Sequence, residues 1–201
     1  MSVLSRRALL AGMGAACFAK PVVAQGLSLN AISAYMNELT TIKARFRQDN
    51  PDGSVSNGTF YLKRPGRMRF EYDPPEPAMV IAGGGALAVF DPRSDEPTRY
   101  PLSQTPLSVI LARKVDLSGA DEIAGTQVSG EFTLVQARDP DHPEYGSISL
   151  VFSDNPVTLR QWIIRDESGA ITRVSLGTLQ TGGRVPDRLF NLIAETRNWN
   201  P

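Results

Sequence analysis

Most of the chain after residue 40 consists of short stretches in which apolar and polar residues alternate, and turn-forming residues such as glycine, proline and aspartate separate the stretches. Alternation with a period of two places the apolar side chains on one face of a β-strand. Eleven strands are predicted, over residues 41–49, 54–64, 66–73, 77–82, 86–91, 97–102, 122–129, 131–138, 146–153, 157–166 and 170–180. Short strands joined by tight turns favour antiparallel pairing. Because a sheet of this size curls, we expect a mainly β protein of the α+β kind whose concave face needs an apolar cover.

Two segments have helical periodicity and can provide this cover. In the first, residues 29–39, Ser28 is a suitable N-cap, and apolar residues recur at positions i, i+3, i+4 and i+7. In the second, residues 106–112, Pro106 suits the first position of a helix, and apolar residues follow on one face. We therefore predict two short helices over the concave face of the sheet.

A run of basic and aromatic residues, Tyr61–Asp73, has the composition of a strand that binds nucleic acid. Alternation mostly separates the two kinds of side chain, because neighbouring residues point to opposite faces. The inner face is predicted to be apolar, with Phe60, Leu62, Met68, Phe70 and Tyr72. The outer face is predicted to be charged and solvated, with Lys63, Arg67, Arg69 and Glu71. Since the formal net charge of the 201 residues is also +0, no nucleic-acid partner is expected.

Arg64 departs from this pattern, because it falls on the apolar side of its strand, directly before the Pro65-Gly66 turn. A guanidinium group keeps its charge and has five donors that need acceptors. Two interpretations remain open. The side chain reaches water at the rim of the sheet, or it donates to carbonyl groups of a covering helix and holds that helix in place.

The first 24 residues differ from the rest and are predicted to be an export signal. Two arginines precede an apolar run that is too short to span a bilayer, and cleavage is expected after Ala24. The stretch Ser5–Leu10 is similar to a twin-arginine signal but departs from its usual pattern, so a general secretory signal is the alternative. Lipid attachment at Cys17 is less favoured, because Gly14 stands where leucine is expected.

The remaining residues, 25–201, are predicted to form a single domain. They contain no cysteine, so they need no disulfide in an oxidising compartment and offer no thiol nucleophile. Removal of the signal takes away three basic residues and no acidic residue, which changes the formal net charge from +0 to −3. A polyanionic partner is therefore even less expected.

Five stretches, in the same order along the chain, resemble the LolA family of periplasmic carriers of outer-membrane lipoproteins: GTFYLKRPGRMRFEYDPP, MVIAGGGALAVFDP, TPLSVILAR, WIIRDESGAITRVSL and VPDRLFNL. The element KRPGRMRFEY is the most specific part. The resemblance implies an incomplete antiparallel β-barrel of eleven strands with short α-helices as a lid, and a location in the periplasm. It also implies that Arg64, the arginine of the Arg-Pro pair, is the latch that holds the lid shut.

A lipoprotein carrier needs a dry cavity that opens, because each exposed methylene costs about 0.8 kcal/mol relative to a buried one. We expect the acyl-chain cavity to be lined by Phe60, Leu62, Met68, Phe70, Tyr72, Val80, Leu87 and Val89. The lid over it is expected to be formed by Ile32, Met36, Leu39, Leu107, Ile110 and Leu111. For each of these residues, ordinary packing in a closed core is the alternative.

The resemblance also indicates the partners. They would be acylated lipoproteins, an inner-membrane ABC transporter that releases lipoproteins, and an outer-membrane acceptor where one exists. The carrier itself is expected to be a monomer. A related half-barrel that binds other lipids, or that senses lipoproteins as a regulator, is the alternative, because fold does not determine function.

An enzyme is not expected. The one histidine, His142, lies near Asp139, Asp141 and Glu144, a set that could ligate a metal. The flanking prolines predict a surface loop, and the spacing matches no common metal site. The sequence has no P-loop and no Gly-x-Ser-x-Gly motif. No catalytic residue, metal or cofactor is therefore predicted.

Overall fold

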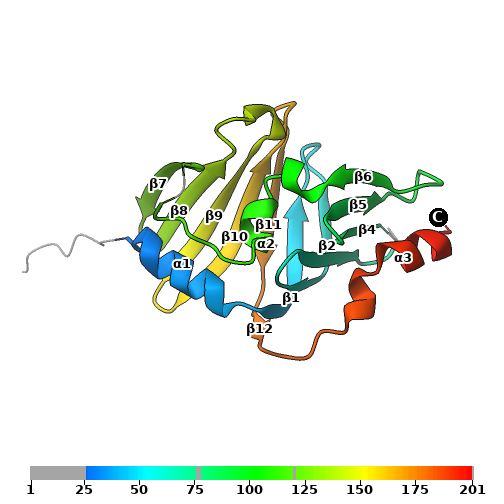
Figure 1. Cartoon of the computed structure of the whole chain (residues 1–201), viewed down its shortest axis with the longest axis horizontal. Helices are drawn as coiled ribbons and strands as arrows, with labels where there is room; N and C mark the ends of the chain where they lie inside the picture. Colours follow the sequence, from blue (N-terminus) through cyan, green and yellow to red (C-terminus); the bar gives the residue numbers. More distant parts are fainter. Residues whose placement is uncertain (1–25, 76–77, 120, 201) are drawn as a thin grey trace, which may run out of the picture.

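The computed structural model describes residues 26–75, 78–119 and 121–200. The predicted signal, residues 1–24, lies outside this range. The strands in the described residues all belong to one antiparallel sheet (Figure 1). They are β1 (Thr41–Asp49), β2 (Val55–Lys63), β3 (Arg67–Tyr72), β4 (Met79–Gly83), β5 (Ala86–Phe90), β6 (Thr98–Pro101), β7 (Ile123–Ser129), β8 (Phe132–Arg138), β9 (Ser147–Asp154), β10 (Val157–Arg165), β11 (Ile171–Leu176) and β12 (Gln180–Thr181).

The strand order confirms the predicted incomplete barrel. From one end to the other it is β6-β5-β4-β3-β2-β1-β11-β10-β9-β8-β7, and β12 pairs beside β1. β6 and β7 are the two ends of the sheet, and residues 102–122 connect them. Figure 1 shows this connection, which includes α2, crossing one side of the sheet.

The predicted strand over residues 170–180 is wrong in one respect, because it is two strands. β11 pairs with the second half of β1, and β12 pairs with Ile42 and Lys43 in its first half. Between them the amide of Gly177 donates to the carbonyl of Arg45 at 2.9 Å, and Leu179 packs against the core. The chain therefore follows β1 along its length but leaves the ladder for a few residues.

The helices are short. They are α1 (Leu29–Glu38), α2 (Ser108–Leu111) and α3 (Leu192–Asn198), with 3-10 turns η1 (Leu102–Gln104), η2 (Pro143–Tyr145) and η3 (Asp187–Phe190). α1 begins as predicted, since the hydroxyl of Ser28 accepts from the amide of Ala31 at 3.2 Å. α2 begins later than predicted, because Pro106 lies in the turn that the amide of Ser108 closes on the carbonyl of Thr105.

Within the described residues, no helix is both long and apolar enough to cross a membrane.

The main core lies between the sheet and the two lid helices, α1 and α2. Phe60 of β2 and Trp162 of β10 meet at its centre with ring centroids 5.2 Å apart, and Phe70 contacts both rings. Edge-to-face contacts of this kind add to the burial of the rings themselves. Ile32 of α1 and Ile110 of α2 are buried in the same cluster. The sheet and the lid therefore share one core.

The outer face of β3 is covered, which corrects the prediction of a solvated face. The side chain of Arg69 is buried, pairs with Glu71 at 2.7 Å and with Glu195 of α3 at 2.9 Å, and donates to the carbonyl of Leu189. A second apolar cluster under the same segment consists of Ile81, Ala88 and Phe90, with Met79, Leu192 and Trp199 packed against them. The prediction failed because α3, which brings this cover, was not predicted.

The C-terminal segment, residues 185–199, lies close against the sheet at Gly83. A Cβ atom at this position would lie 2.4 Å from the carbonyl oxygen of Phe190, which is closer than side chains tolerate. Lys63 and Arg67 both bond to Asp187 at 2.6 Å on the same face. The part of the sheet around β3 to β5 is therefore covered on its outer face by this segment.

Candidate functional site

The structure brings the predicted cavity and lid residues together. All six predicted lid residues are buried in the main core cluster. Five of the predicted cavity residues are buried in the same cluster, namely Phe60, Leu62, Met68, Phe70 and Leu87. Tyr72 and Val80 pack at its margin, and Val89 lies opposite Val80 on β5. The predicted lining and the predicted cover thus face each other with their side chains in contact as one cluster, and their use for acyl chains stays a prediction.

The guanidinium group of Arg64 reaches both lid helices. Its Nε and Nη2 donate to the carbonyl of Ala112, just after α2, at 3.1 and 2.7 Å. Its Nη1 donates to the carbonyl of Met36 in α1, and Nη2 also lies 3.4 Å from Oδ1 of Asn37. This is the geometry of the second interpretation, in which the arginine bonds to its cover. A role in opening and closing stays a prediction.

The backbone of the β2–β3 hairpin fixes the position of Arg64. The amide of Arg64 donates to the carbonyl of Thr40, and the amide of Gly66 donates to the carbonyl of Leu111, both at 2.9 Å. Gly66 has a φ of 70°, a conformation that glycine adopts without steric cost. The Arg-Pro-Gly turn is therefore tied both to the segment after α1 and to the end of α2.

The acceptors of the Arg64 guanidinium are neutral oxygens. Desolvation lowers the pKa of Arg64, but its ordinary pKa is so high that the group stays charged at neutral pH. A hydrogen bond to a charged group contributes about 1.5–3 kcal/mol. The contacts are therefore strong enough to favour a closed lid, and they can be broken without leaving a carboxylate unpaired.

Asn37 is a second connection within the lid, which sequence reasoning missed. Its Nδ2 donates to the carbonyl of Val115 at 2.8 Å, and its Oδ1 accepts from the amide of Val115 at 2.9 Å. One turn away, the hydroxyl of Ser33 accepts from the amide of Leu117 at 2.9 Å. These contacts tie α1 to residues 112–117. Nothing in the sequence distinguishes Asn37 from any polar residue on a helix surface.

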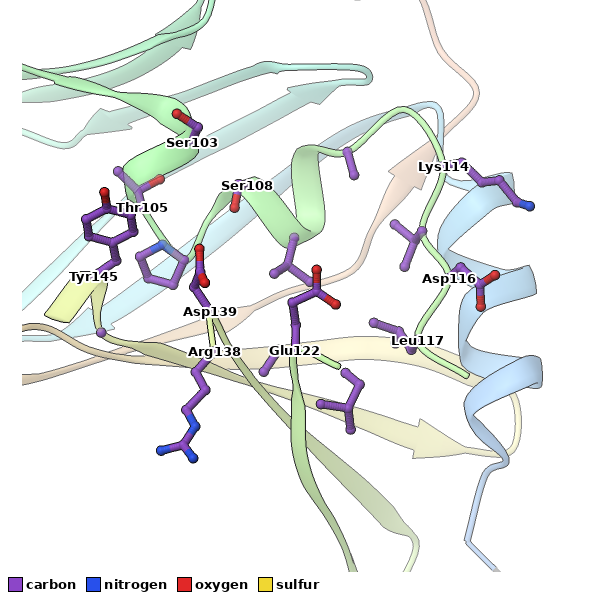
Figure 2. A pocket seen from close by; sticks show the side chains of 17 residues that line it. Ser103, Thr105, Ser108, Lys114, Asp116, Leu117, Glu122, Arg138, Asp139 and Tyr145 are labelled. Carbon is purple, nitrogen blue, oxygen red and sulfur yellow. The ribbon is translucent and has the colours of Figure 1, made fainter. Parts of the chain in front are cut away.

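A pocket of about 240 Å³ lies beside this part of the lid (Figure 2). Figure 2 shows Thr105, Asp139 and Tyr145 at one end and Lys114 and Asp116 at the other. The apolar part of the wall consists of Val109, Ala112, Val115, Leu117, Ile123 and Ala137. The pocket therefore lies between the lid segment and the β7–β8 edge of the sheet, a place that the sequence did not predict.

A wider groove of about 680 Å³ lies at the β3–β5 side, and three predicted cavity residues line it, namely Tyr72, Val80 and Val89. Tyr72 separates the groove from the core. Its hydroxyl donates to Oε1 of Gln48 at 2.8 Å, and its ring meets that of Phe46 edge to face, with centroids 5.2 Å apart.

The His142 loop has no metal-site geometry. In the described part of the chain, no group of three or more His, Cys, Asp or Glu side chains is placed to hold a metal ion. Nδ1 of His142 lies 2.9 Å from Oε1 of Glu144, and this hydrogen bond raises the pKa of the histidine. The imidazole also stacks on Tyr145, with ring centroids 4.7 Å apart. Contacts with Glu144 and Tyr145 in the same loop therefore account for the position of the His142 side chain.

Comparison with known proteins gives the family. The model of the outer membrane lipoprotein carrier protein LolA matches residues 37–193. An outer-membrane lipoprotein carrier protein of Legionella pneumophila (strain Corby) is 26% identical over 174 residues, which cover 81% of this chain and 84% of that protein. One from Coxiella burnetii (strain CbuK_Q154) is 31% identical over 148 residues, which cover 68% of this chain and 70% of that protein.

Among solved structures, a LolA superfamily protein from Nitrosomonas europaea is similar with a TM-score of 0.45 and 13% identity, over 84% of this chain and 100% of that chain. The family model spans the sheet, α2 and the Arg64 hairpin, and it begins near the end of α1. The chain therefore belongs to the family of the outer membrane lipoprotein carrier protein LolA.

Proposed function

We propose that the protein is a periplasmic chaperone that carries lipoproteins from the inner to the outer membrane with their acyl chains held between lid and sheet. The observation that supports this most directly is Arg64, which bonds both lid helices above an apolar core. A cover held by the bonds of Arg64 and one backbone bond from Gly66 to Leu111 can open while the strand ladders stay intact. The acyl chains would then lie against the predicted cavity residues of β2 to β5.

A competition between lid closure and acyl burial would make the binding reversible. In the closed protein, the lid side chains are buried against the sheet. Acyl chains would take their place, at about 0.8 kcal/mol per buried methylene. The gain is offset by the contacts that lid and sheet give up and by the broken bonds of Arg64. The net affinity is therefore moderate, which hand-over to a second carrier or membrane requires.

The proposal includes the route and the partners. Residues 1–24 would direct export, and residues 25–201 would work as a monomeric domain in the periplasm. An inner-membrane ABC transporter would load the lipoprotein, and an outer-membrane acceptor would receive it. The relatives described as outer-membrane lipoprotein carrier proteins support the cargo class. No catalytic step is needed, because the cargo leaves chemically unchanged.

The test is the identity of the bound lipid. Residues 25–201 would be purified from the periplasm of cells that make triacylated lipoproteins, and the complex would be weighed intact by native mass spectrometry. The expected result is a triacylated lipoprotein bound one to one. A cargo whose lipid-bearing cysteine is replaced by serine is the control and should not bind. Free phospholipid or an empty protein, together with no release of lipoprotein from inner-membrane vesicles, would contradict the carrier and favour the lipid-binding or regulatory alternative.

A further inference from the structure

The pocket of about 240 Å³ lies where the sheet is open. Its walls come from the connection after β6, which includes Ser103 and Ser108, and from the start of β7 and the end of β8, which include Ile123 and Ala137. β6 and β7 are the two ends of the strand order, so this connection takes the place of a strand pair there. The pocket is thus a point at which solvent comes close to the core without a strand ladder in between.

The apolar wall of the pocket is continuous with the core. Val115, Leu117 and Ala137 are buried members of the main core cluster. Three further wall residues, Val109, Ala112 and Ile123, pack against that cluster. A ligand in the pocket is therefore one layer of side chains away from the space between lid and sheet.

The rim of the pocket carries charges of both signs, which favours an uncharged ligand. Lys114 and Arg138 are basic, whereas Asp116, Glu122 and Asp139 are acidic. Mixed signs attract neither anions nor cations strongly. The volume is also below the range of about 300–1,000 Å³ that is typical of small-molecule pockets. An apolar wall, a mixed rim and a small volume fit the end of one hydrocarbon chain better than a whole lipid.

The inner wall of the pocket is attached in a way that allows it to move. Residues 112–117 are held by side-chain contacts, from Arg64 to Ala112, from Asn37 to Val115 and from Ser33 to Leu117. No strand or helix of the structure includes these six residues. Opening this wall breaks a few side-chain bonds and exposes Val115 and Leu117, but it costs no strand pair.

The wider groove at the β3–β5 side has no wall that can move in this way. Val80 and Val89 on its wall are paired with each other across β4 and β5, and Val80 also pairs with Phe70 of β3. A path from this groove into the core would run along the inner face of the sheet and would have to displace Tyr72, which is bonded to Gln48 and packed against Phe46. The groove is therefore a poor route for an acyl chain.

We propose that the pocket is the portal through which the acyl chains of the cargo pass between water and the core, one chain at a time. Asn37 is the positioning residue that keeps the inner wall of the portal closed. This inference rests on the proposed function, and it adds the route and the residue that controls it.

The experiment blocks each route separately. Residues 25–201 contain no cysteine, so a single one can be introduced at either site. Ser108→Cys places it in the portal, and Ser56→Cys places it in the wider groove as the matched control. Each variant is labelled with a rigid aromatic maleimide. Loading is then followed by fluorescence anisotropy with a synthetic tripalmitoylated cysteinyl peptide that carries fluorescein on its polar end.

The expected result is that the label at residue 108 slows loading at least about tenfold, whereas the label at residue 56 changes it less than about twofold. Each labelled variant is compared with its own unlabelled form, and near-ultraviolet circular dichroism checks that the labelled proteins are folded. If the label at residue 108 perturbs the fold, Ser103→Cys at the exposed rim replaces it. A parent protein that does not bind the lipopeptide contradicts the proposed function. A parent that binds while only the label at residue 56 blocks loading overturns the portal alone.

Asn37 has its own test in the same assay. Asn37→Ala should load the lipopeptide several-fold faster, because the inner wall loses both bonds to Val115. Asn37→Asp, which keeps the acceptor for the amide of Val115 but loses the donor, should lie between Asn37→Ala and the parent. Asn57→Ala, at an exposed asparagine of β2, is the control and should load like the parent. Equal loading rates in all four proteins would overturn the positioning role.

Discussion

At the scale of residues, two side chains with different chemistry hold the lid. Arg64 joins the lid to the β2–β3 hairpin through a charged group that donates to neutral carbonyls. Asn37 joins one lid segment to the other through a paired amide contact. Both residues hold residues 112–117, but only Arg64 also joins the lid to the sheet, so the two should affect the protein differently. We expect Arg64 to set the balance between the closed and open states of the lid. We expect Asn37 to set how easily acyl chains enter through the portal.

Replacement of Arg64 by leucine should strengthen cargo binding and slow hand-over. The variant loses the bonds that favour the closed, empty state, each worth about 1.5–3 kcal/mol. A loss of 1.4 kcal/mol corresponds to about a tenfold change in affinity, so cargo should bind at least about tenfold more tightly. The measurements are lipopeptide affinity by anisotropy and transfer of bound lipoprotein to outer-membrane vesicles.

Arg67→Leu is the matched control for this prediction, because Arg67 lies on the outer face and pairs with Asp187. It should leave cargo affinity and transfer close to those of the parent. Parental affinity together with parental transfer in Arg64→Leu would show that the arginine is not the latch.

At the scale of elements, the β-strands were predictable and the C-terminal segment was not. Alternation identifies a strand whenever one face is buried, as in β2, β8 and β9. α3 contributes only Leu192 to an apolar cluster and has no fully buried residue, so its seven residues gave too weak an apolar pattern to predict a helix. The burial of Arg69 depends on α3 and could not be predicted without it. For the same reason, the portal and Asn37 were missed, since both are defined by contacts between distant segments.

The attachment of the C-terminal segment should weaken in acid. A hydrogen bond from Lys63, with the charges of Lys63 and Arg67, holds the pKa of Asp187 below its ordinary value of about 3.9. A carboxyl whose pKa is lower in the folded state adds stability above its unfolded pKa, and this contribution is lost as the pH falls through the folded pKa. Hydrogen exchange of residues 187–199, corrected for the intrinsic pH dependence, should therefore show less protection below about pH 4.

Asp187→Asn should give reduced protection of this segment already at pH 7, with little further change in acid. Asp166→Asn is the control, because the pKa of Asp166 is lowered within its own turn by Ser168. It should leave residues 187–199 as protected as in the parent. Unchanged protection in Asp187→Asn would mean that the apolar cluster around Trp199 and the Arg69–Glu195 pair hold the segment without Asp187.

At the scale of the whole molecule, the sheet and the lid are held by different kinds of bond. The sheet has continuous ladders between neighbouring strands, whereas residues 112–117 are attached by side chains of α1 and of the hairpin. Segments with few backbone bonds open at lower free energy than the global unfolding reaction. The lid should therefore open while the sheet remains folded.

Hydrogen exchange at single-residue resolution can check this. The amides of Val115 and Leu117, which donate to side chains of α1, should exchange through local opening, well before the amides of β2 and β3. Addition of the tripalmitoylated peptide should speed exchange at these two amides and leave the strands unchanged. Equal opening free energies in lid and sheet would mean that the protein opens only by unfolding.

The gap between β6 and β7 has a consequence for what the protein can hold. In a closed barrel, the number of strands and their stagger fix the circumference, and the interior has one size. A sheet with two separate ends has no fixed circumference, so its curvature can relax while every strand keeps its neighbours. The volume available inside the curved sheet then depends on the cargo that it holds. Chains of different length and number can be accommodated by one sequence, at the expense of selectivity among them.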